Sequence, residues 1–251
     1  MHFSARGLVL SARTVGEWDR SLTLLLEGIG RVSVWARGAK RIKSPLLAPC
    51  SPFAFSSFTL HQKGERVTVE SAELTESFFE LRNDVEALAL AAWLTDLTGT
   101  LCVERQPEDG LLRLVLNALY ALSRGKEAAL VKPAFELRLL SEAGFLPELT
   151  GCLHCGEEPC AFSAAEGGVL CQRHALSRPD AIPLSPAVLA ALRHLTQCDD
   201  RRLYAYRLPP PALAELTALA ERYVIHTIGA EPQTLRFYRS MAVPPPQGDK
   251  S

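Results

Sequence analysis

The sequence predicts an α+β protein in which strands occupy roughly the first 80 residues, helices follow, and a cysteine-rich segment interrupts the helices. Three observations predict this class. First, apolar and polar residues alternate along the first part of the chain. Second, near residue 80 the spacing of the apolar residues becomes that of one face of a helix. Third, four of the seven cysteines lie within residues 152–171. With 251 residues, of which 47% are hydrophobic and 22% charged, the chain has the composition of a folded globular protein.

The first 80 residues contain five runs with the properties of β-strands. They are residues 5–12, 22–26, 31–36, 53–60 and 65–72, and glycine-containing turns separate several of them. Five short strands of this kind are typical of a small barrel or sandwich, and we expect a five-stranded OB-fold barrel over residues 1–80. Small barrels need large inward side chains, so we expect these aromatic residues in the core: Trp18, Trp35, Phe53 and Phe55.

Helices are predicted over residues 85–103, 110–124, 132–143, 186–197 and 211–227, where apolar positions recur with helical spacing. Ser185 and Pro186 form an N-cap followed by a first-turn proline, and Gly144 and Gly229 lie just beyond helix ends. We expect these helices to form one domain over residues 81–150 and 176–240. The proline-rich tail, residues 241–251, is predicted to be disordered.

The segment between residues 151 and 175 has the spacing of metal ligands. Cys152 and Cys155 form a C-x-x-C pair, and Cys171 and His174 form a C-x-x-H pair that begins 16 positions after Cys155. Two such pairs are typical of a tetrahedral zinc site. The fourth ligand is either His174, which completes the second pair, or Cys160, a softer thiolate between the pairs. We therefore predict a zinc finger or ribbon, inserted in the helical domain, with Zn²⁺ as its cofactor.

This zinc site is expected to be structural. A catalytic zinc keeps one coordination position open and has a carboxylate beside it, whereas four or five candidate ligands crowd this short loop. The sequence also lacks H-E-x-x-H, and it lacks H-x-E combined with P-C-x-x-C. A zinc-dependent enzyme acting on nucleic acid is the first alternative function, and a protein–protein adaptor is the second.

The net charge of −1 conceals an asymmetry along the chain. Residues 1–70 contain ten Lys and Arg against five Asp and Glu, a balance of +5, and the remaining residues have a balance of −6. Four of the cations lie between Arg37 and Lys43, in a predicted long loop between two strands. Loops of an OB barrel border its nucleic-acid groove, so this end is expected to bind a polyanion, largely independently of sequence and weakly at high salt.

The same residues resemble the bacterial RecO family of recombination mediators. Residues 5–20 are similar to the family's opening strand, turn and second strand, and residues 30–40 to its third strand and basic loop. Pro52-Phe53 and residues 73–78 also fit, and residues 135–171 resemble the helix and zinc segment that follow, so that order and spacing match from about residue 4 to residue 240. One departure is His174, where zinc-bearing members usually have cysteine.

The resemblance implies a protein that is not an enzyme and acts in recombinational DNA repair. Family members bind single- and double-stranded DNA, anneal complementary strands, and act with RecR to load RecA onto DNA coated by single-stranded DNA-binding protein. By position, the resemblance implies phosphate contacts from Arg20, Arg37, Lys40, Arg41 and Lys43, and more weakly from Arg13, Lys63 and Arg66.

The sequence also predicts where the protein resides. No apolar run reaches the roughly 18 residues that span a bilayer, and residues 1–6 lack the features of a signal peptide. We therefore expect a cytoplasmic, nucleoid-associated protein that has no membrane partner.

Overall fold

The computed structural model describes residues 1–242, and these fall into two compact units. Of the described residues, the first unit contains 1–124 and 234–242, and the second contains Gly125–Gln233. The predicted disordered tail falls mainly on residues 243–251, which lie outside the described residues, whereas Met241 and Ala242 end the last helix.

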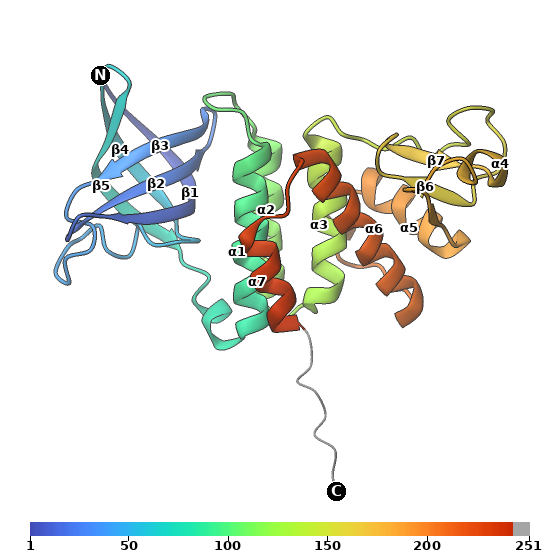
Figure 1. Cartoon of the computed structure of the whole chain (residues 1–251). Coiled ribbons are helices and arrows are strands. Elements are labelled where there is room, and N and C mark those ends of the chain that lie inside the picture. The colour runs from blue at the N-terminus through green and yellow to red at the C-terminus, as the bar shows by residue number, and fades with distance from the viewer. Residues whose placement is uncertain (243–251) are drawn as a thin grey trace, which may run out of the picture. The chain divides into compact units, whose positions relative to one another are not determined.

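Five strands at the start of the first unit close into a barrel (Figure 1). They are β1 (His2–Val15), β2 (Asp19–Leu26), β3 (Gly30–Ala36), β4 (Phe55–Lys63) and β5 (Arg66–Glu76). Their order around the barrel is β1-β2-β3-β5-β4, with β1 antiparallel to β4 and β3 parallel to β5. A closed five-stranded barrel of this kind is OB-like, and the predicted fold class is confirmed.

Alternation along the strands decides which side chains fill the barrel. Val32, Val34 and Ala36 of β3 are buried in its core, whereas Ser33 and Trp35 between them lie on the outer face. Successive side chains of a strand point to opposite faces, so the polar–apolar alternation in the sequence produces this division.

The aromatic residues of the barrel are placed differently from our prediction. Phe58 is buried in the core at 1% exposure, whereas Phe53, Phe55 and Trp35 are half-buried and Trp18 is 41% exposed. The expected strand over residues 53–60 begins later, at Phe55, and Phe53 lies before β4 with a φ of +67°. The prediction that these four fill the core is wrong, because leucine and valine side chains together with Phe58 already occupy the interior.

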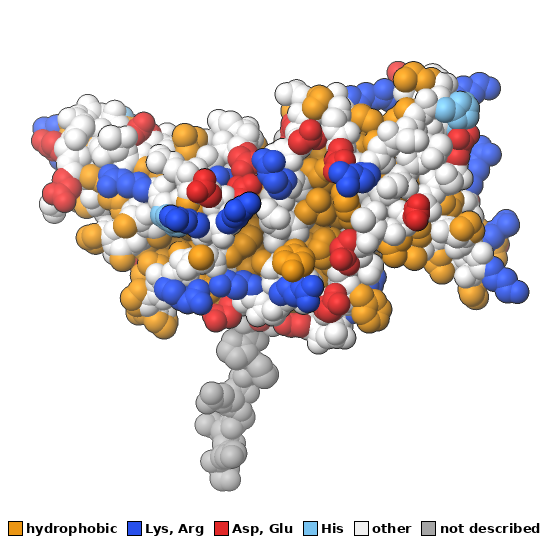
Figure 2. Space-filling model, turned by 180° about the vertical axis from the view of Figure 1, so that it is seen from behind, with side chains coloured by type: hydrophobic (Ala, Val, Ile, Leu, Met, Phe, Trp, Pro, Cys, Tyr) orange, Lys and Arg blue, Asp and Glu red, His pale blue; other side chains and the backbone are white. Residues whose placement is uncertain are grey.

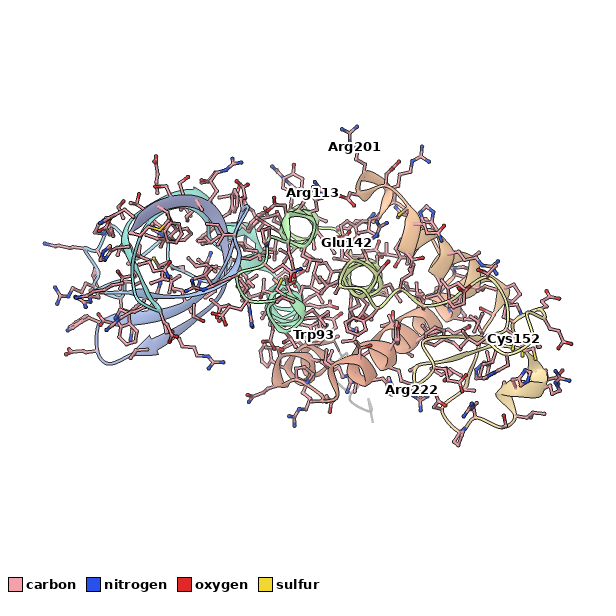
Figure 3. The ribbon with its side chains drawn as sticks, turned by 90° about the horizontal axis from the view of Figure 1, so that it is seen from above. Trp93, Arg113, Glu142, Cys152, Arg201 and Arg222 are labelled. Carbon is pink, nitrogen blue, oxygen red and sulfur yellow. The ribbon has the colours of Figure 1, made fainter. Side chains whose placement is uncertain are left out.

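Three helices and a short 3₁₀ helix complete the first unit: η1 (Phe79–Asn83), α1 (Val85–Leu101), α2 (Asp109–Ser123) and α7 (Gln233–Ala242). Asp84 caps α1, because its carboxylate accepts hydrogen bonds from the backbone N–H groups of Glu86 and Ala87 at 2.9 and 3.2 Å. Trp93 of α1 is fully buried (Figure 3). Helix α7 was not predicted; it is ten residues long, and its buried residues are only Leu235 and Tyr238.

Gly30 is required where the barrel meets the segment after α1. Its φ is +91°, and a Cβ there would lie 1.8 Å from the carbonyl oxygen of Gln106. We expect Gly30→Ala to lower the free energy of unfolding by about 2–3 kcal/mol, as measured by urea denaturation. Gly28→Ala is the matched control, since φ is +66° there and nothing lies within 4 Å of a built Cβ. Equal losses in the two variants would contradict this role of the Gln106 contact.

The second unit is a set of helices with a small sheet inserted between them (Figure 1). Its helices are α3 (Ala128–Glu142), α5 (Pro186–Gln197), α6 (Pro210–Ile228) and the 3₁₀ helix η2 (Asp200–Arg202). The insertion contains β6 (Ala161–Ser163), β7 (Gly168–Leu170), α4 (Gln172–Ala175) and β8 (Ile182–Pro183), with the strands in the order β7-β6-β8. As predicted, the Ser185 side chain caps α5, by accepting a hydrogen bond from the N–H of Val188.

A buried ion cluster connects α3 to α6. Lys132 is 1% exposed, and its Nζ lies 2.8 Å from Oε1 of Glu136 and 2.8 Å from Oε2 of Glu221. A buried ammonium group needs such partners, because desolvation would otherwise outweigh its attraction to any single charge. Among residues 1–242, no helix is long and apolar enough to cross a membrane.

Candidate nucleic-acid interface and metal centre

The predicted basic loop connects β3 to β4 and spans residues 37–54. Three of its apolar side chains, Ala39, Leu46 and Cys50, are buried in the barrel core. The backbone N–H of Lys40 donates to the carbonyl oxygen of Trp18 at 2.9 Å, which joins the loop to the β1–β2 turn. The loop is therefore anchored to the barrel at several points.

Asp19 fixes the start of the basic loop. Its Oδ1 accepts the backbone N–H of Gly38 at 2.8 Å, and its Oδ2 accepts the indole N–H of Trp35 at 3.2 Å. The Gly38 hydrogen bond is the main reason why the pKa of Asp19 is lowered; partial desolvation opposes this shift, and the Trp35 hydrogen bond and nearby arginine charges favour it. Asp19 is therefore ionised at neutral pH and holds the loop against β3.

Arg20 fixes the middle of the loop. Its Nη1 donates to the carbonyl oxygens of Leu47 and Cys50 at 3.1 and 2.8 Å and to Oγ of Ser51 at 3.2 Å. The side chain is half-buried, and these contacts position the loop. Its predicted phosphate contact stays a prediction.

The loop itself carries four cations, Arg37, Lys40, Arg41 and Lys43. Arg37, Arg41 and Lys43 are exposed and Lys40 is half-buried. Within residues 1–242, none of these four side chains forms an ion pair or a side-chain hydrogen bond. On the face drawn in Figure 2, several Lys and Arg side chains project from the edge of the barrel. The loop therefore carries charges that are available to an anionic ligand.

Two aromatic residues that we expected in the core lie beside these cations, Trp18 exposed and Trp35 half-buried. Trp35 lies on the outer face of β3, and the guanidinium of Arg66 lies 5.0 Å from its ring centroid. Trp18 lies in the β1–β2 turn, next to the loop. We call the following set the basic face: Trp18, Trp35, Arg37, Lys40, Arg41, Lys43 and Arg66. OB barrels bind oligonucleotides on their β2–β3 side, between the β1–β2 and β4–β5 turns, and the basic face occupies that position.

The other predicted cations are exposed at the margins of the barrel. Arg13 lies on β1, and Lys63 ends β4 at the β4–β5 turn that precedes Arg66. Neither forms an ion pair within the described part of the chain. Their predicted DNA contacts also stay predictions.

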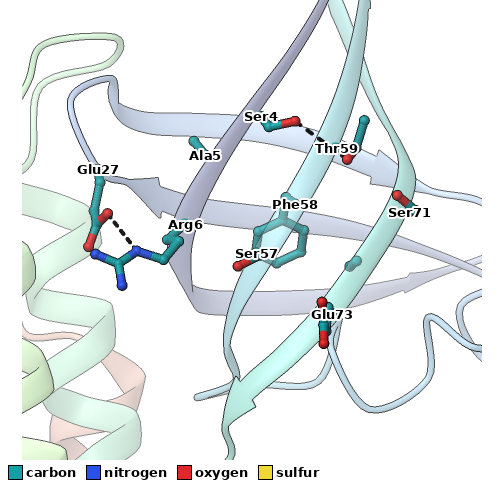
Figure 4. Close-up of a pocket in the computed structure, with 10 residues that line it drawn as sticks. Ser4, Ala5, Arg6, Glu27, Ser57, Phe58, Thr59, Ser71 and Glu73 are labelled. Carbon is teal, nitrogen blue, oxygen red and sulfur yellow. Dashed lines mark hydrogen bonds and ion pairs between the residues drawn. The ribbon is translucent and has the colours of Figure 1, made fainter.

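A groove on the outside of β1, β4 and β5 has a different chemistry (Figure 4). It is lined by the hydroxyl groups of Ser4, Ser57, Thr59 and Ser71, among other residues. Arg6 is the cation among the lining residues, and its Nε is paired with Oε2 of Glu27 at 2.9 Å. Glu73 adds a second carboxylate. This groove is poorly suited to phosphate, in contrast to the basic face.

Four candidate metal ligands converge in the inserted segment of the second unit, around Cys152 (Figure 3). Cys152 and Cys155 precede β6, Cys171 follows β7, and His174 lies on α4. Nδ1 of His174 lies 3.3 Å from the sulfur atoms of Cys152 and Cys171 and 3.5 Å from that of Cys155. The sulfur atoms of Cys155 and Cys171 are 3.6 Å apart, and all four ligand atoms lie within 4.8 Å of one another.

These separations suit a tetrahedral zinc ion. Zinc–sulfur bonds of about 2.3 Å and zinc–nitrogen bonds of about 2.0 Å place neighbouring ligand atoms roughly 3.5–3.8 Å apart. Three thiolates and one imidazole are also a donor set that zinc prefers, and the three cysteines are free of disulfides. The cluster could therefore hold a metal ion.

The local backbone prepares Cys152 for this role. The N–H groups of Cys155 and Gly156 donate to its carbonyl oxygen at 3.3 and 2.8 Å and form a tight turn in which Gly156 has a φ of +74°. Burial acts to raise the pKa of the Cys152 thiol, but hydrogen bonds with the backbone of Cys171, His154 and Cys155 lower it to about 6. The thiolate is the form that binds a metal.

Cys160, the alternative fourth ligand, is not part of the cluster. It is exposed, and its backbone pairs with the neighbouring strands, since its N–H donates to Leu170 and its carbonyl accepts from Leu184. His154 is also outside the cluster; its ring packs on His174 at 4.8 Å, and its Nε2 lies 2.8 Å from Oε2 of Glu166. The structure thus brings His174, and not Cys160, to the three cysteines.

An OB-type barrel followed by helices defines the class of protein. Among these helices lies an inserted cluster of three cysteines and one histidine that could hold a metal ion. Two family models match this architecture in order, "Recombination protein O N terminal" over residues 1–78 and "Recombination protein O C terminal" over residues 82–236. The chain belongs to the RecO family, which confirms the resemblance seen in its sequence.

Curated relatives agree over nearly the whole chain. The DNA repair protein RecO of Desulforudis audaxviator is 36% identical over 244 residues, which cover 96% of this chain and 98% of that protein. The DNA repair protein RecO of Acetivibrio thermocellus is 31% identical over 244 residues, which cover 96% of this chain and 97% of that protein.

Proposed function

We propose that this protein is a DNA repair mediator that binds single- and double-stranded DNA on the basic face of its barrel and anneals complementary strands. The observation that carries the proposal is the anchored basic loop. Its four cations form no ion pair within residues 1–242, and Trp18 and Trp35 lie beside it. Cations that follow a groove attract phosphates, and aromatic rings stack on bases of any identity. The names of its relatives support a role in DNA repair.

Annealing by such a surface needs no covalent chemistry, so we propose that the protein is not an enzyme. Two DNA strands repel each other through their phosphates, and a cationic surface reduces this repulsion while both are bound. Four protein ligands fill a tetrahedral zinc shell and leave no position for a reacting water. We therefore assign the metal as structural Zn²⁺, with His174 as the fourth ligand.

The family relationship supports further parts of the proposal. RecR and single-stranded DNA-binding protein are the proposed protein partners, and loading of RecA onto DNA is the proposed outcome, in the cytoplasm near the nucleoid. Residues 1–80 would form the DNA-binding domain, residues 151–175 the zinc module, and residues 81–150 and 176–240 the helical domain.

A strand-annealing assay on the intact protein tests this function. Two complementary oligonucleotides with a fluorescent donor and acceptor should anneal faster with the protein, and the acceleration should be much larger at about 50 mM than at about 300 mM salt, because phosphate contacts release counterions. No acceleration at either salt concentration would overturn the proposal. Chemical change of the oligonucleotides would instead support a zinc-dependent enzyme.

A further inference from the structure

Ile42 lies at the tip of the basic loop and points away from the protein. It is 89% exposed, which makes it the most exposed large hydrophobic side chain among residues 1–242. Its chain neighbours are the exposed cations Arg41 and Lys43. A fully exposed isoleucine between two cations has no evident role in folding, because it buries almost no surface.

The loop holds Ile42 in this position. The N–H of Arg41 donates to the carbonyl oxygen of Gly38 at 3.1 Å, and the N–H of Ser44 donates to that of Arg41 at 2.9 Å. Ile42 and Lys43 are therefore the two central residues of a tight turn. Buried side chains anchor the loop on both sides of this turn, so that Ile42 cannot fold back into the barrel without breaking those contacts.

We propose that Ile42 is a wedge that inserts between neighbouring bases of the DNA held on the basic face. The inference rests on the proposed function and adds how the loop engages the bases. Arg41 and Lys43 would bind phosphates on either side and bring the isoleucine against the base stack. Apolar side chains, isoleucine included, unstack bases in this way in other DNA-binding proteins, without reading sequence.

The charges around Ile42 favour DNA over a protein as its ligand. Arg37, Lys40, Arg41 and Lys43 all lie within five residues of it and form no ion pair in the described part of the chain. The core of a protein–protein interface is depleted in charged residues, lysine among them, whereas a polynucleotide supplies both the phosphates and the flat apolar faces that this tip requires.

The test compares Ile42→Ala with Leu176→Ala in the intact protein. Leu176 is the matched control, because it is 85% exposed but lies in the second unit. The probe is an oligodeoxynucleotide that contains 2-aminopurine, whose fluorescence rises when the base is unstacked. The wild-type protein should raise this fluorescence, Ile42→Ala should abolish the rise and bind roughly five- to tenfold more weakly, and Leu176→Ala should behave as wild type.

Two further measurements keep the outcomes separate. The salt dependence of binding should be the same for Ile42→Ala and wild type, because no charge is removed, and Ile42→Leu should restore the fluorescence rise. A wild-type fluorescence rise in Ile42→Ala, or no rise in the wild type despite salt-sensitive binding, would overturn the wedge and leave the proposed function standing. No salt-sensitive binding by the wild type would overturn the proposed function itself.

Discussion

Removal of the proposed zinc ion with a strong chelator should unfold residues 150–184 while the barrel stays folded. The strands of this segment are only two or three residues long, and the buried cluster around the candidate ligands consists of Cys152, Leu170 and Cys171. Phe162 and Val169 are the large apolar side chains that the strands themselves bury besides Leu170. Structural zinc sites contribute about 10–16 kcal/mol of binding free energy, far more than this small core can supply. Hydrogen exchange at the backbone amides of β6 and β7, followed before and after chelation, measures the effect.

Single substitutions test the ligand assignment. Cys171→Ser should reduce the zinc content of the purified protein to background, whereas Cys160→Ser should leave it at one ion per chain, because the Cys160 thiol lies outside the cluster. His174→Cys should also retain zinc, since a thiolate can replace the imidazole in the tetrahedral shell. Loss of zinc from Cys160→Ser, together with full zinc in His174→Ala, would show that Cys160 is the fourth ligand.

Replacement of the four loop cations Arg37, Lys40, Arg41 and Lys43 by alanine should weaken the binding of single-stranded DNA by roughly two to three orders of magnitude at about 0.1 M salt. Each lost phosphate contact lowers the slope of log affinity against log salt by about 0.7, so that the slope should fall by about three units. Fluorescence anisotropy at several salt concentrations measures both quantities. Because these side chains form no hydrogen bond or ion pair with another described residue, the unfolding midpoint should change little.

The matched control removes the same charge from the second unit. Arg201, Arg202, Arg207 and Arg222 are exposed there, and their replacement by alanine should change the slope by less than one unit. If the loop variant kept the wild-type affinity and slope, the basic face would not be the DNA interface. The alternative interpretation, a protein–protein adaptor with an incidental basic loop, would then be favoured.

The sequence by itself determined the features that are set by residues close together along the chain, namely the barrel strands, the start of a helix and the pairs of candidate metal ligands. Alternation with a period of two residues showed the barrel strands, and Ser185 with Pro186 placed the start of α5 at the residue that the structure shows. The C-x-x-C and C-x-x-H pairs identified the candidate metal ligands, because two ligands on one short turn are held together by the chain itself. The resemblance to the RecO family rested on the same local motifs.

Only the tertiary structure decided which distant residues meet. The parallel pairing of β3 with β5 brings Arg66 over the ring of Trp35, although the two residues lie far apart in the sequence. The backbone of Cys160 is hydrogen-bonded to Leu170 and to Leu184, and its thiol lies outside the metal-ligand cluster. His174 is the residue that joins the three cysteines. These outcomes depend on strand order and register, which are set by burial over the whole unit and leave no signal in a short stretch of sequence.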